Sequence, residues 1–420
     1  MNIFNVSLLT ALSTATRMVS GFIINKTLAV YSGPIGIAMV GQLQNFNSIL
    51  CTLSKGGINS GVVKYISEKK GINKKIKIIS TSFYICTISS IILSSIMFIS
   101  ADYLSVNILD DLSYSYIFKV FSFTILFFSL NSILMSIING LQQIKKYIII
   151  NIIGSLISLL ITFTLITYYN ISGALLAIVI NQSLIFFVTI FLFDKRVFLN
   201  LKLLCNNFCI HYCKKLFFFT IMTIVTAISV PLSQYIIRDY IKDNLSIIDA
   251  GIWQGMLYFS STYLIFVTST INVYYTPKIS SLNNKLDIRN EIKKGFYTLI
   301  PIVCFLSIFI FYFRTFIISI IFTKEFISMQ SLFKYYLLGD VIKIAAFLLS
   351  SIMLAKALTK VYIISEVVFS LSFVLFSIYF ISKYGLIGTS YAYVTNYSLY
   401  LLFTIIYFRD YLWKTKVKSQ

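Results

Sequence analysis

The chain has 420 residues, of which 58% are hydrophobic and 12% are charged, and its mean hydropathy is +0.87. Soluble domains carry about 25% charged residues, so this composition excludes a soluble globular protein and indicates a chain immersed in a membrane. A formal net charge of +21 would suit nucleic acid, but the basic residues are placed as membrane topology requires, and no nucleic-acid partner is expected.

Twelve stretches of the chain are long and apolar enough to cross a bilayer, which takes about 20 mostly apolar residues. They predict an all-α, polytopic membrane protein of about 12 transmembrane helices with no soluble domain between them. The first stretch ends in the turn Ser32-Gly33-Pro34 and lacks a small-residue cleavage site, so we expect it to be retained rather than removed as a signal peptide. The twelve centres lie near Val19, Phe46, Ile88, Ile125, Ile157, Leu184, Thr226, Tyr263, Ser307, Val341, Leu371 and Leu399.

Lysine and arginine are distributed unevenly over the connections between these stretches. Even-numbered connections and the C-terminal tail hold 24 of the 35 basic residues, whereas odd-numbered connections, which include Arg238 and Lys242, hold six. Basic residues concentrate in cytoplasmic loops, so the bias predicts that both termini are cytoplasmic. A missed or additional helix would destroy the alternation, which supports the count of twelve.

The sequence repeats itself weakly at an offset of 215 residues. Residues 145–149 match 360–364, Gly173 matches Gly388, and Gly36-Ile37 matches Gly251-Ile252. Six spans per half is an even number, so the halves are parallel repeats. This predicts a six-helix bundle over residues 1–194, a basic cytoplasmic linker over 195–215, and a second six-helix bundle over 216–420 with a short cytoplasmic tail.

Ionisable residues at membrane depth cost about 2.5–3.5 kcal/mol each on insertion scales, so each is a candidate functional residue. Arg17 lies in the middle of the first stretch, Lys26 lies nine residues later, and Lys55 ends the second stretch. Facing a cavity, these cations would bind an anion such as a pyrophosphate. The alternative for Lys26 and Lys55 is that their ammonium groups reach to the membrane interface.

Two acids and a lysine in the second half are candidates for ion coupling. Asp340 and Lys343 are three residues apart, close enough to pair on one helix face. Such a pair would lock helix packing, or Asp340 would carry a proton while unpaired. Glu366 has no local partner and occupies the position of Asn151 in the first half.

No metal, cofactor or nucleotide site is expected. The cluster Cys205-x3-Cys209-x-His211-x-Cys213 does not match the spacing of structural zinc sites. The chain lacks a G-x-x-x-x-G-K-[ST] phosphate loop, so the energy for transport would come from an ion gradient or from the gradient of the substrate.

Several segments resemble one family. They are Leu28-Ala29-Val30 with Gly33-Pro34-x-Gly36, Gly61-Val62-x-Lys64-Tyr65, Gly251-Ile252-Trp253-Gln254-Gly255, Gly339-Asp340-Val341-x-Lys343, and Ala355-Lys356-Ala357 followed by Tyr362-Ile363 and Glu366-Val367. They resemble the Wzx-type flippases of O-antigen and enterobacterial common antigen, which belong to the polysaccharide-transporter branch of the MOP exporter superfamily.

The resemblance implies two six-helix bundles in a MATE-like V that opens in turn to each side of a bacterial inner membrane. It implies a cargo of undecaprenyl-pyrophosphate-linked oligosaccharide, moved from the cytoplasmic to the periplasmic leaflet, with ion antiport as one option. Arg17 and Lys26 would hold the pyrophosphate; at Lys55 the family tends to be apolar or small. Membrane lipids, a polysaccharide polymerase and a chain-length regulator are the other partners it suggests.

Three alternatives remain. A multidrug or cation antiporter of the same superfamily would prefer an acidic cavity. A membrane enzyme of polysaccharide assembly would need catalytic groups in a large outer loop, whereas this chain has short outer loops and a single histidine, so an enzyme is not expected. A purely structural partner of the assembly machinery would leave the charges within the spans unexplained.

Overall fold

A computed structural model describes residues 3–68, 71–192, 208–282, 284–356 and 358–412. All of the regular secondary structure in these ranges is helical. Each of the twelve predicted span centres lies within a helix, and seven segments of the described residues are long and apolar enough to cross a membrane. The prediction of an all-α, polytopic membrane protein is confirmed, and twelve spans are consistent with the helices observed.

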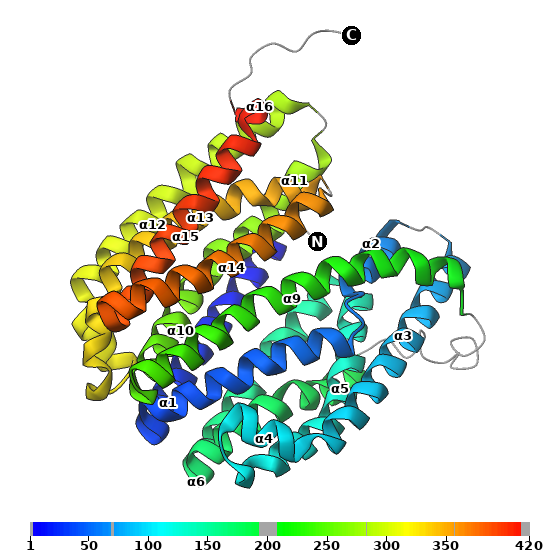
Figure 1. The fold of residues 1–420 in the computed structure, drawn as a ribbon. Helices are drawn as coiled ribbons and strands as arrows, with labels where there is room; N and C mark the ends of the chain where they lie inside the picture. Colours follow the sequence, from blue (N-terminus) through cyan, green and yellow to red (C-terminus); the bar gives the residue numbers. More distant parts are fainter. Residues whose placement is uncertain (1–2, 69–70, 193–207, 283, 357, 413–420) are drawn as a thin grey trace. The chain divides into compact units, whose positions relative to one another are not determined.

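The first of two compact units comprises residues 1–32 and 39–232 (Figure 1, blue to green). Helices α5 and α6 pack side by side, and α3 packs on α5. The core of this unit consists of isoleucine, leucine and valine side chains of α2, α3, α5 and α6, together with Leu216 of α9. The unit contains α1 (Ile3–Ser54), α2 (Asn59–Glu68), α3 (Ile72–Ile99), α4 (Ala101–Leu109), the 3₁₀ helix η1 (Leu112–Tyr114), α5 (Ser115–Gly140), α6 (Ile144–Leu192) and the first part of α9 (Ile210–Asn244).

The second unit comprises residues 33–38 and 233–420. Within it, α13 and α15 run side by side, as Figure 1 shows in orange and red, and α12 packs on α13. After the end of α9 it contains α10 (Ile247–Thr270), the π-helical turn η2 (Ile271–Tyr275), α11 (Thr276–Ser281), α12 (Lys285–Ile321), η3 (Lys324–Met329), α13 (Gln330–Ala355), α14 (Thr359–Tyr384), η4 (Gly385–Ile387), α15 (Gly388–Tyr407) and α16 (Arg409–Leu412).

The boundary between the units lies within a helix. Helix α9 belongs to the first unit up to Leu232 and to the second from Ser233. The predicted linker over 195–215 lies mostly outside the described residues. The division into bundles over 1–194 and 216–420 therefore stays a prediction.

Three of the seven candidate spans are 43, 48 and 49 residues long, about twice the length that a bilayer requires. Each contains a residue with positive φ at which the helix breaks: Gly33 (φ 58°), Asn170 (φ 50°) and Gly385 (φ 59°). Glycine adopts such angles without a Cβ clash, and asparagine tolerates them. Each long segment is thus two helices joined by a tight turn, and the predicted turn at Gly33 is confirmed.

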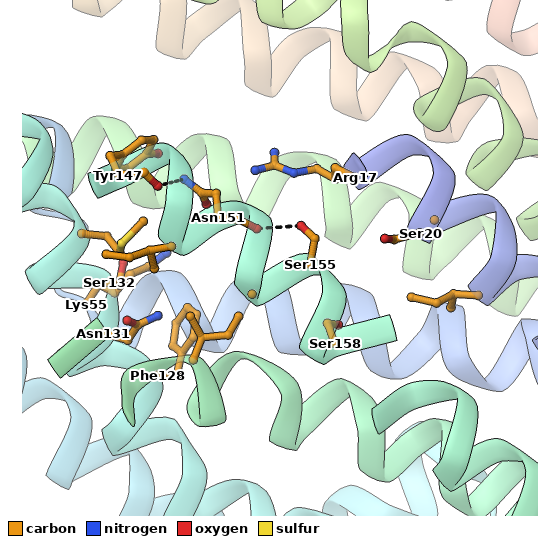
Figure 2. Close-up of a pocket in the computed structure, with 16 residues that line it drawn as sticks. Arg17, Ser20, Lys55, Phe128, Asn131, Ser132, Tyr147, Asn151, Ser155 and Ser158 are labelled. Carbon is orange, nitrogen blue, oxygen red and sulfur yellow. Dashed lines mark hydrogen bonds between the residues drawn. The ribbon is translucent and has the colours of Figure 1, made fainter. Parts of the chain in front are cut away.

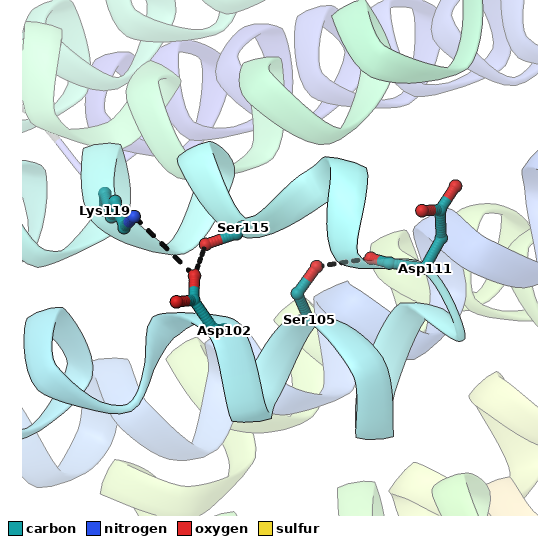
Figure 3. A network of polar contacts seen from close by, with 5 residues as sticks. All are labelled: Asp102, Ser105, Asp111, Ser115 and Lys119. Atoms are coloured by element: carbon teal, nitrogen blue, oxygen red, sulfur yellow. Dashed lines mark hydrogen bonds and ion pairs between the residues drawn. The ribbon is translucent and has the colours of Figure 1, made fainter.

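A polar contact ties α4 to the start of α5 (Figure 3). Ser115 donates a hydrogen bond to the Asp102 carboxylate, and the Lys119 ammonium lies 3.6 Å from the same carboxylate oxygen. The hydrogen bond from Ser115, together with the charge of Lys119, holds the pKa of Asp102 below its ordinary value. Ser105 also donates a 2.5 Å hydrogen bond to the backbone carbonyl of Asp111, which closes the turn after α4.

The motif Gly251-Ile252-Trp253-Gln254-Gly255 begins one turn into α10, and a close backbone contact explains its first residue. A Cβ atom on Gly251 would lie 1.9 Å from the carbonyl oxygen of Pro34 and 2.4 Å from its carbon. These atoms belong to the backbone and cannot rotate away. Only glycine therefore allows the tip of the first helical hairpin, residues 33–38, to pack on α10.

The Asp102 contact gives a prediction about pH. A carboxylate whose pKa is lowered by folding stabilises the fold above its unfolded pKa of about 3.9, and that contribution disappears as the pH falls through the lower folded pKa. Hydrogen exchange of the α4 peptide, corrected for intrinsic rates, should therefore show equal protection from pH 5 to pH 8. Asp102→Asn should reduce this protection throughout the range. Wild-type protection that falls between pH 8 and pH 5 would contradict this assignment.

The contact at Gly251 predicts the effect of a single methyl group. Gly251→Ala should destabilise the protein by about 1–3 kcal/mol, because a tightly packed site has to move backbone to admit the methyl group. Thermal unfolding of the detergent-solubilised protein, followed by size-exclusion chromatography, measures the effect. Gly71→Ala is the matched control, because a Cβ there meets nothing within 4 Å. Equal midpoints for the two variants would show that Gly251 is not tightly packed.

Candidate functional site

The first unit contains a polar cavity of about 760 Å³ between α1, α5 and α6 (Figure 2). Pockets that bury small ligands measure about 300–1,000 Å³. The cavity is bounded by the cations Arg17 and Lys55 and by neutral polar side chains of α5 and α6. The polar members of its lining are Arg17, Ser20, Lys55, Asn131, Ser132, Tyr147, Asn151, Ser155 and Ser158.

Lys55 follows directly after the last residue of α1, and its side chain is half-buried. A helix C-terminus carries partial negative charge and favours a cation there. The Lys55 ammonium lies 5.2 Å from the centre of the Phe128 ring, close to the buried thiols of Cys51 and Cys86. Such a contact with a ring stabilises a cation by about 0.5–2 kcal/mol. Within the described residues, the Lys55 ammonium makes no ion pair with a carboxylate.

Arg17 reaches the cavity from α1. Figure 2 shows its guanidinium directed across the cavity toward Asn151 of α6. The side chain is exposed, and among the described residues it makes no hydrogen bond or ion pair. A guanidinium group presents five N–H donors in a planar fork that matches phosphate oxygens, so Arg17 is available to an anionic ligand.

The structure brings together two of the three predicted cations. Arg17 and Lys55 both line the cavity, whereas Lys26 is half-buried and does not belong to its lining. Lys26 is nine residues after Arg17 on the same helix, which rotates it about a half-turn away from the Arg17 face. A role for Lys26 in binding stays a prediction.

Neutral polar residues on α6 form the side of the cavity opposite Arg17 and were not recognised from sequence. Tyr147, Asn151, Ser155 and Ser158 recur at intervals of three or four residues, so they share one helix face. The Asn151 amide nitrogen donates to the carbonyl of Tyr147 at 2.9 Å, and the Ser155 hydroxyl donates to the carbonyl of Asn151 at 2.9 Å. Polar residues at this period in an otherwise apolar helix were the signal that could have identified them.

In the second unit, Asp340 of α13 is completely buried and accepts hydrogen bonds from three hydroxyl groups. Ser260 donates to both carboxylate oxygens at 2.7 and 2.9 Å, and Tyr263 and Tyr393 each donate at 2.7 Å. Hydrogen bonds of this kind stabilise an ionised carboxylate against the cost of burial. Asp340 therefore joins α10, α13 and α15 at one point.

The other two candidates for ion coupling take no part in these hydrogen bonds, although the charge of Lys343 is close enough to act on the carboxylate. The Lys343 ammonium lies 5.7 Å from the centre of the Tyr393 ring and 5.4 Å from that of Tyr397. It forms no ion pair with Asp340 among the described residues. Glu366 of α14 is half-buried beside Tyr362 and takes no part in the Asp340 hydrogen bonds. The roles of Asp340, Lys343 and Glu366 in ion coupling stay predictions.

Arg238 is a buried charge that sequence reasoning missed. The count of basic residues in alternate connections placed Arg238 in a connection between two spans. In the structure, Arg238 lies within α9 and is only 1% exposed. Its guanidinium donates to the Gln254 side-chain oxygen and lies 5.8 Å from the centre of the Trp253 ring. The Trp253 N–H in turn donates to the Tyr336 hydroxyl at 2.5 Å. Trp253 and Gln254, the third and fourth residues of the α10 motif, thus hold a buried arginine.

The cysteine and histidine cluster falls only partly within the described chain. Cys205 lies outside the described residues, and Cys209 and Cys213 are free thiols. Among the described residues, no three His, Cys, Asp or Glu side chains gather as a metal site would require.

Two curated relatives match nearly the whole chain. Both are named lipid III flippase, one from Escherichia coli (strain K12) and one from Shigella flexneri. Each is 26% identical over 401 residues, which are 95% of this chain and 96% of the relative.

Solved structures show a similar fold at low sequence identity. An inward-facing multidrug resistance MATE family transporter of the MOP superfamily matches with a TM-score of 0.75 at 14% identity, covering 94% of this chain and 95% of that one. The lipid II flippase MurJ in an inward closed conformation matches with a TM-score of 0.70 at 17% identity, covering 97% and 87%. At these identities the likeness concerns the fold alone.

The family comparison agrees with the resemblance derived from sequence motifs. The model of a family described as polysaccharide biosynthesis protein matches residues 43–331, more than half of the chain. This multi-pass membrane protein therefore belongs to that family of polysaccharide biosynthesis proteins.

Proposed function

We propose that this protein is a flippase that moves an undecaprenyl-pyrophosphate-linked oligosaccharide from the cytoplasmic to the periplasmic leaflet of a bacterial inner membrane. One observation carries the proposal: Arg17 and Lys55 line a polar cavity in an apolar helical unit and form no ion pairs within the described residues. The relatives named lipid III flippase, which match 95% of the chain, support a lipid-linked cargo. They are transporters by name, which agrees with the expectation that the chain is not an enzyme.

The two cations are costly without an anion. Each ionisable group held at membrane depth costs about 2.5–3.5 kcal/mol on insertion scales. Two cations without an ion pair among the described residues therefore destabilise the protein while no ligand is bound. A diphosphate would offset that penalty through charge-assisted hydrogen bonds, and the planar guanidinium of Arg17 can bind two of its oxygens at once. Lys55 would act as a point charge, held over the Phe128 ring.

The volume and the surroundings of the cavity fit only part of the cargo. About 760 Å³ accommodates a headgroup of small-ligand size rather than a whole oligosaccharide repeat. The prenyl chain, being apolar, would stay among the membrane lipids. Alternating access would then carry the headgroup across, with both termini in the cytoplasm. A polysaccharide polymerase and a chain-length regulator would act on the delivered product.

A multidrug or cation exporter is the alternative within the same fold, and Asp340 is the residue that would favour it. That carboxylate already accepts hydrogen bonds from Ser260, Tyr263 and Tyr393 and is completely buried, so it presents no open anionic site to a drug. Asp340 is better suited to carry an ion that couples transport, with Lys343 and Glu366 as further candidates.

The cation cavity predicts a loss of transport when either charge is removed. Arg17→Ala and Lys55→Ala should each reduce surface polysaccharide at least tenfold in a flippase-null bacterium that carries the cognate sugar genes, because one charged hydrogen bond contributes about 1.5–3 kcal/mol. Arg17→Lys should retain partial activity, since lysine keeps the positive charge and lacks the planar set of N–H donors of a guanidinium group. The measurement is the polymer on a gel, with membrane abundance checked by immunoblot.

Lys214→Ala is the matched control for the charge change, because Lys214 is an exposed lysine of α9 outside the cavity. It should leave polymer unchanged. Wild-type polymer from both Arg17→Ala and Lys55→Ala would overturn the role of the cavity. Drug resistance, together with no polymer from the wild-type protein, would favour the exporter.

If Asp340 couples transport to an ion, removing its charge should affect transport, whereas removing one of its hydrogen bonds should affect stability. Asp340→Asn should abolish polymer while the protein still reaches the membrane, because the amide keeps the size of the side chain and loses the charge. Tyr393→Phe should keep the charge and lower stability by about 1 kcal/mol, the net contribution of one hydrogen bond. Polymer assays combined with thermal unfolding in detergent check both. Full transport by Asp340→Asn would exclude an ion-coupling role for this carboxylate.

A further inference from the structure

The cavity contains hydrogen-bonding groups that a diphosphate cannot use. An ionised diphosphate only accepts hydrogen bonds, so the donors Arg17 and Lys55 suit it. A side-chain carbonyl of the protein, or a hydroxyl whose hydrogen is already donated elsewhere, can only accept and does not suit it. Several groups of the latter kind face the same space (Figure 2). Their presence calls for a second part of the ligand that can donate.

The acceptors lie on α6. One of the two hydrogens of the Asn151 side-chain nitrogen is donated to the carbonyl of Tyr147, and the second can still donate. The Asn151 side-chain oxygen is an acceptor without a partner among the described residues. The hydroxyl hydrogen of Ser155 is used by the carbonyl of Asn151, so its oxygen can only accept. Ser158, one turn further on, has no hydrogen-bond partner in the described part of the chain and can donate or accept.

The donors lie opposite, on α5. The Thr189 hydroxyl lies 2.6 Å from the Asn131 side-chain oxygen and 3.0 Å from the Ile185 carbonyl, so these two acceptors share its single hydrogen. The side-chain nitrogen of Asn131 can donate. Asn131 is only 8% exposed and lines the cavity, so this donor is within reach of a ligand that enters there. The Ser132 oxygen accepts a 2.5 Å hydrogen bond from Asn59, and its own hydrogen stays available.

A sugar is the chemical class that fits both sets of groups. Each sugar hydroxyl donates one hydrogen bond and accepts others, so it can satisfy an acceptor on α6 and a donor on α5 at once. A prenyl chain offers no hydrogen bonds, and a cationic drug would be repelled by Arg17 and Lys55. The neutral groups begin beside the cations, where the first sugar after the diphosphate would lie.

We propose that Asn151, Ser155 and Ser158 on α6, with Asn131 and Ser132 on α5, form a subsite that binds the sugar directly attached to the diphosphate. This rests on the proposed function and adds a specificity determinant to it. The subsite extends over two turns of α6, about 10 Å, which limits it to the sugar next to the diphosphate. Discrimination arises because a mismatched sugar leaves buried polar groups of the protein unpaired.

The experiment compares lipids with and without a sugar on the full chain in nanodiscs, by native mass spectrometry. The probes are undecaprenyl diphosphate and the same lipid carrying one glucose, galactose or N-acetylglucosamine. Wild-type protein should bind at least one glycosylated lipid about tenfold more tightly than the bare lipid. The double variant Asn151→Ala/Ser158→Ala should reduce this preference to under about twofold and keep its affinity for the bare lipid, since it loses about two hydrogen bonds.

Thr164→Ala is the matched control, an exposed position on α6 outside the cavity, and should keep the preference. The subsite is overturned if wild-type protein does not prefer any glycosylated lipid, or if the double variant loses both lipids equally. The proposed function fails separately, if Arg17→Ala and Lys55→Ala bind bare undecaprenyl diphosphate as tightly as wild type. Both fail if wild-type protein binds none of the four lipids.

Discussion

A charge inside an apolar helical unit needs polar partners, either from the protein itself or from a bound ligand. The two units meet this requirement in different ways. In the second unit the balance is internal: three hydroxyl groups surround Asp340, and Gln254 and Trp253 hold Arg238. In the first unit, Lys55 has an aromatic ring and two thiols near its ammonium and no carboxylate partner among the described residues. Satisfied polar networks stabilise one packing, whereas unsatisfied groups create affinity. The complete set of partners around Asp340 therefore favours one packing of its helices, whereas Arg17 and Lys55 are left to bind a ligand.

Hydrophobicity and backbone chemistry made much of the fold predictable. A bilayer can be crossed only by long apolar helices or closed barrels, so long apolar stretches of the sequence identify the spans. Gly33 predicts a turn in which the chain reverses direction, because few other residues adopt positive φ. The 215-residue offset also pairs Asn170 with Gly385, and both interrupt a long helical segment. The repeat noticed in the sequence therefore extends to the backbone angles of the turns.

The candidate site was predictable only one helix at a time. Spacing along α1 identified Arg17 and Lys26 as charges at depth, but it could not show that α5 and α6 close a cavity on the side of Arg17 alone. The polar face with Asn151 and Ser155 looked ordinary, because serine and asparagine cost little in a single helix when they bond to their own backbone. Arg238 was misplaced because a charge rule assigns a basic residue to a loop and cannot foresee the partners that bury it.

The six residues 33–38 have a consequence for how the chain can move. They lie in the middle of the first helical hairpin but belong to the second unit, so the chain crosses from one unit to the other at three points rather than one. The first crossing lies beside Pro34, and the third, within α9, directly follows Pro231. Proline removes a backbone hydrogen bond and permits a helix to bend. Because the tip packs on Gly251 without room for a methyl group, it cannot slide. The first hairpin thus contributes helix to the first unit and its tip to the second, so bending near these prolines would change the path of the chain at two of the three crossings.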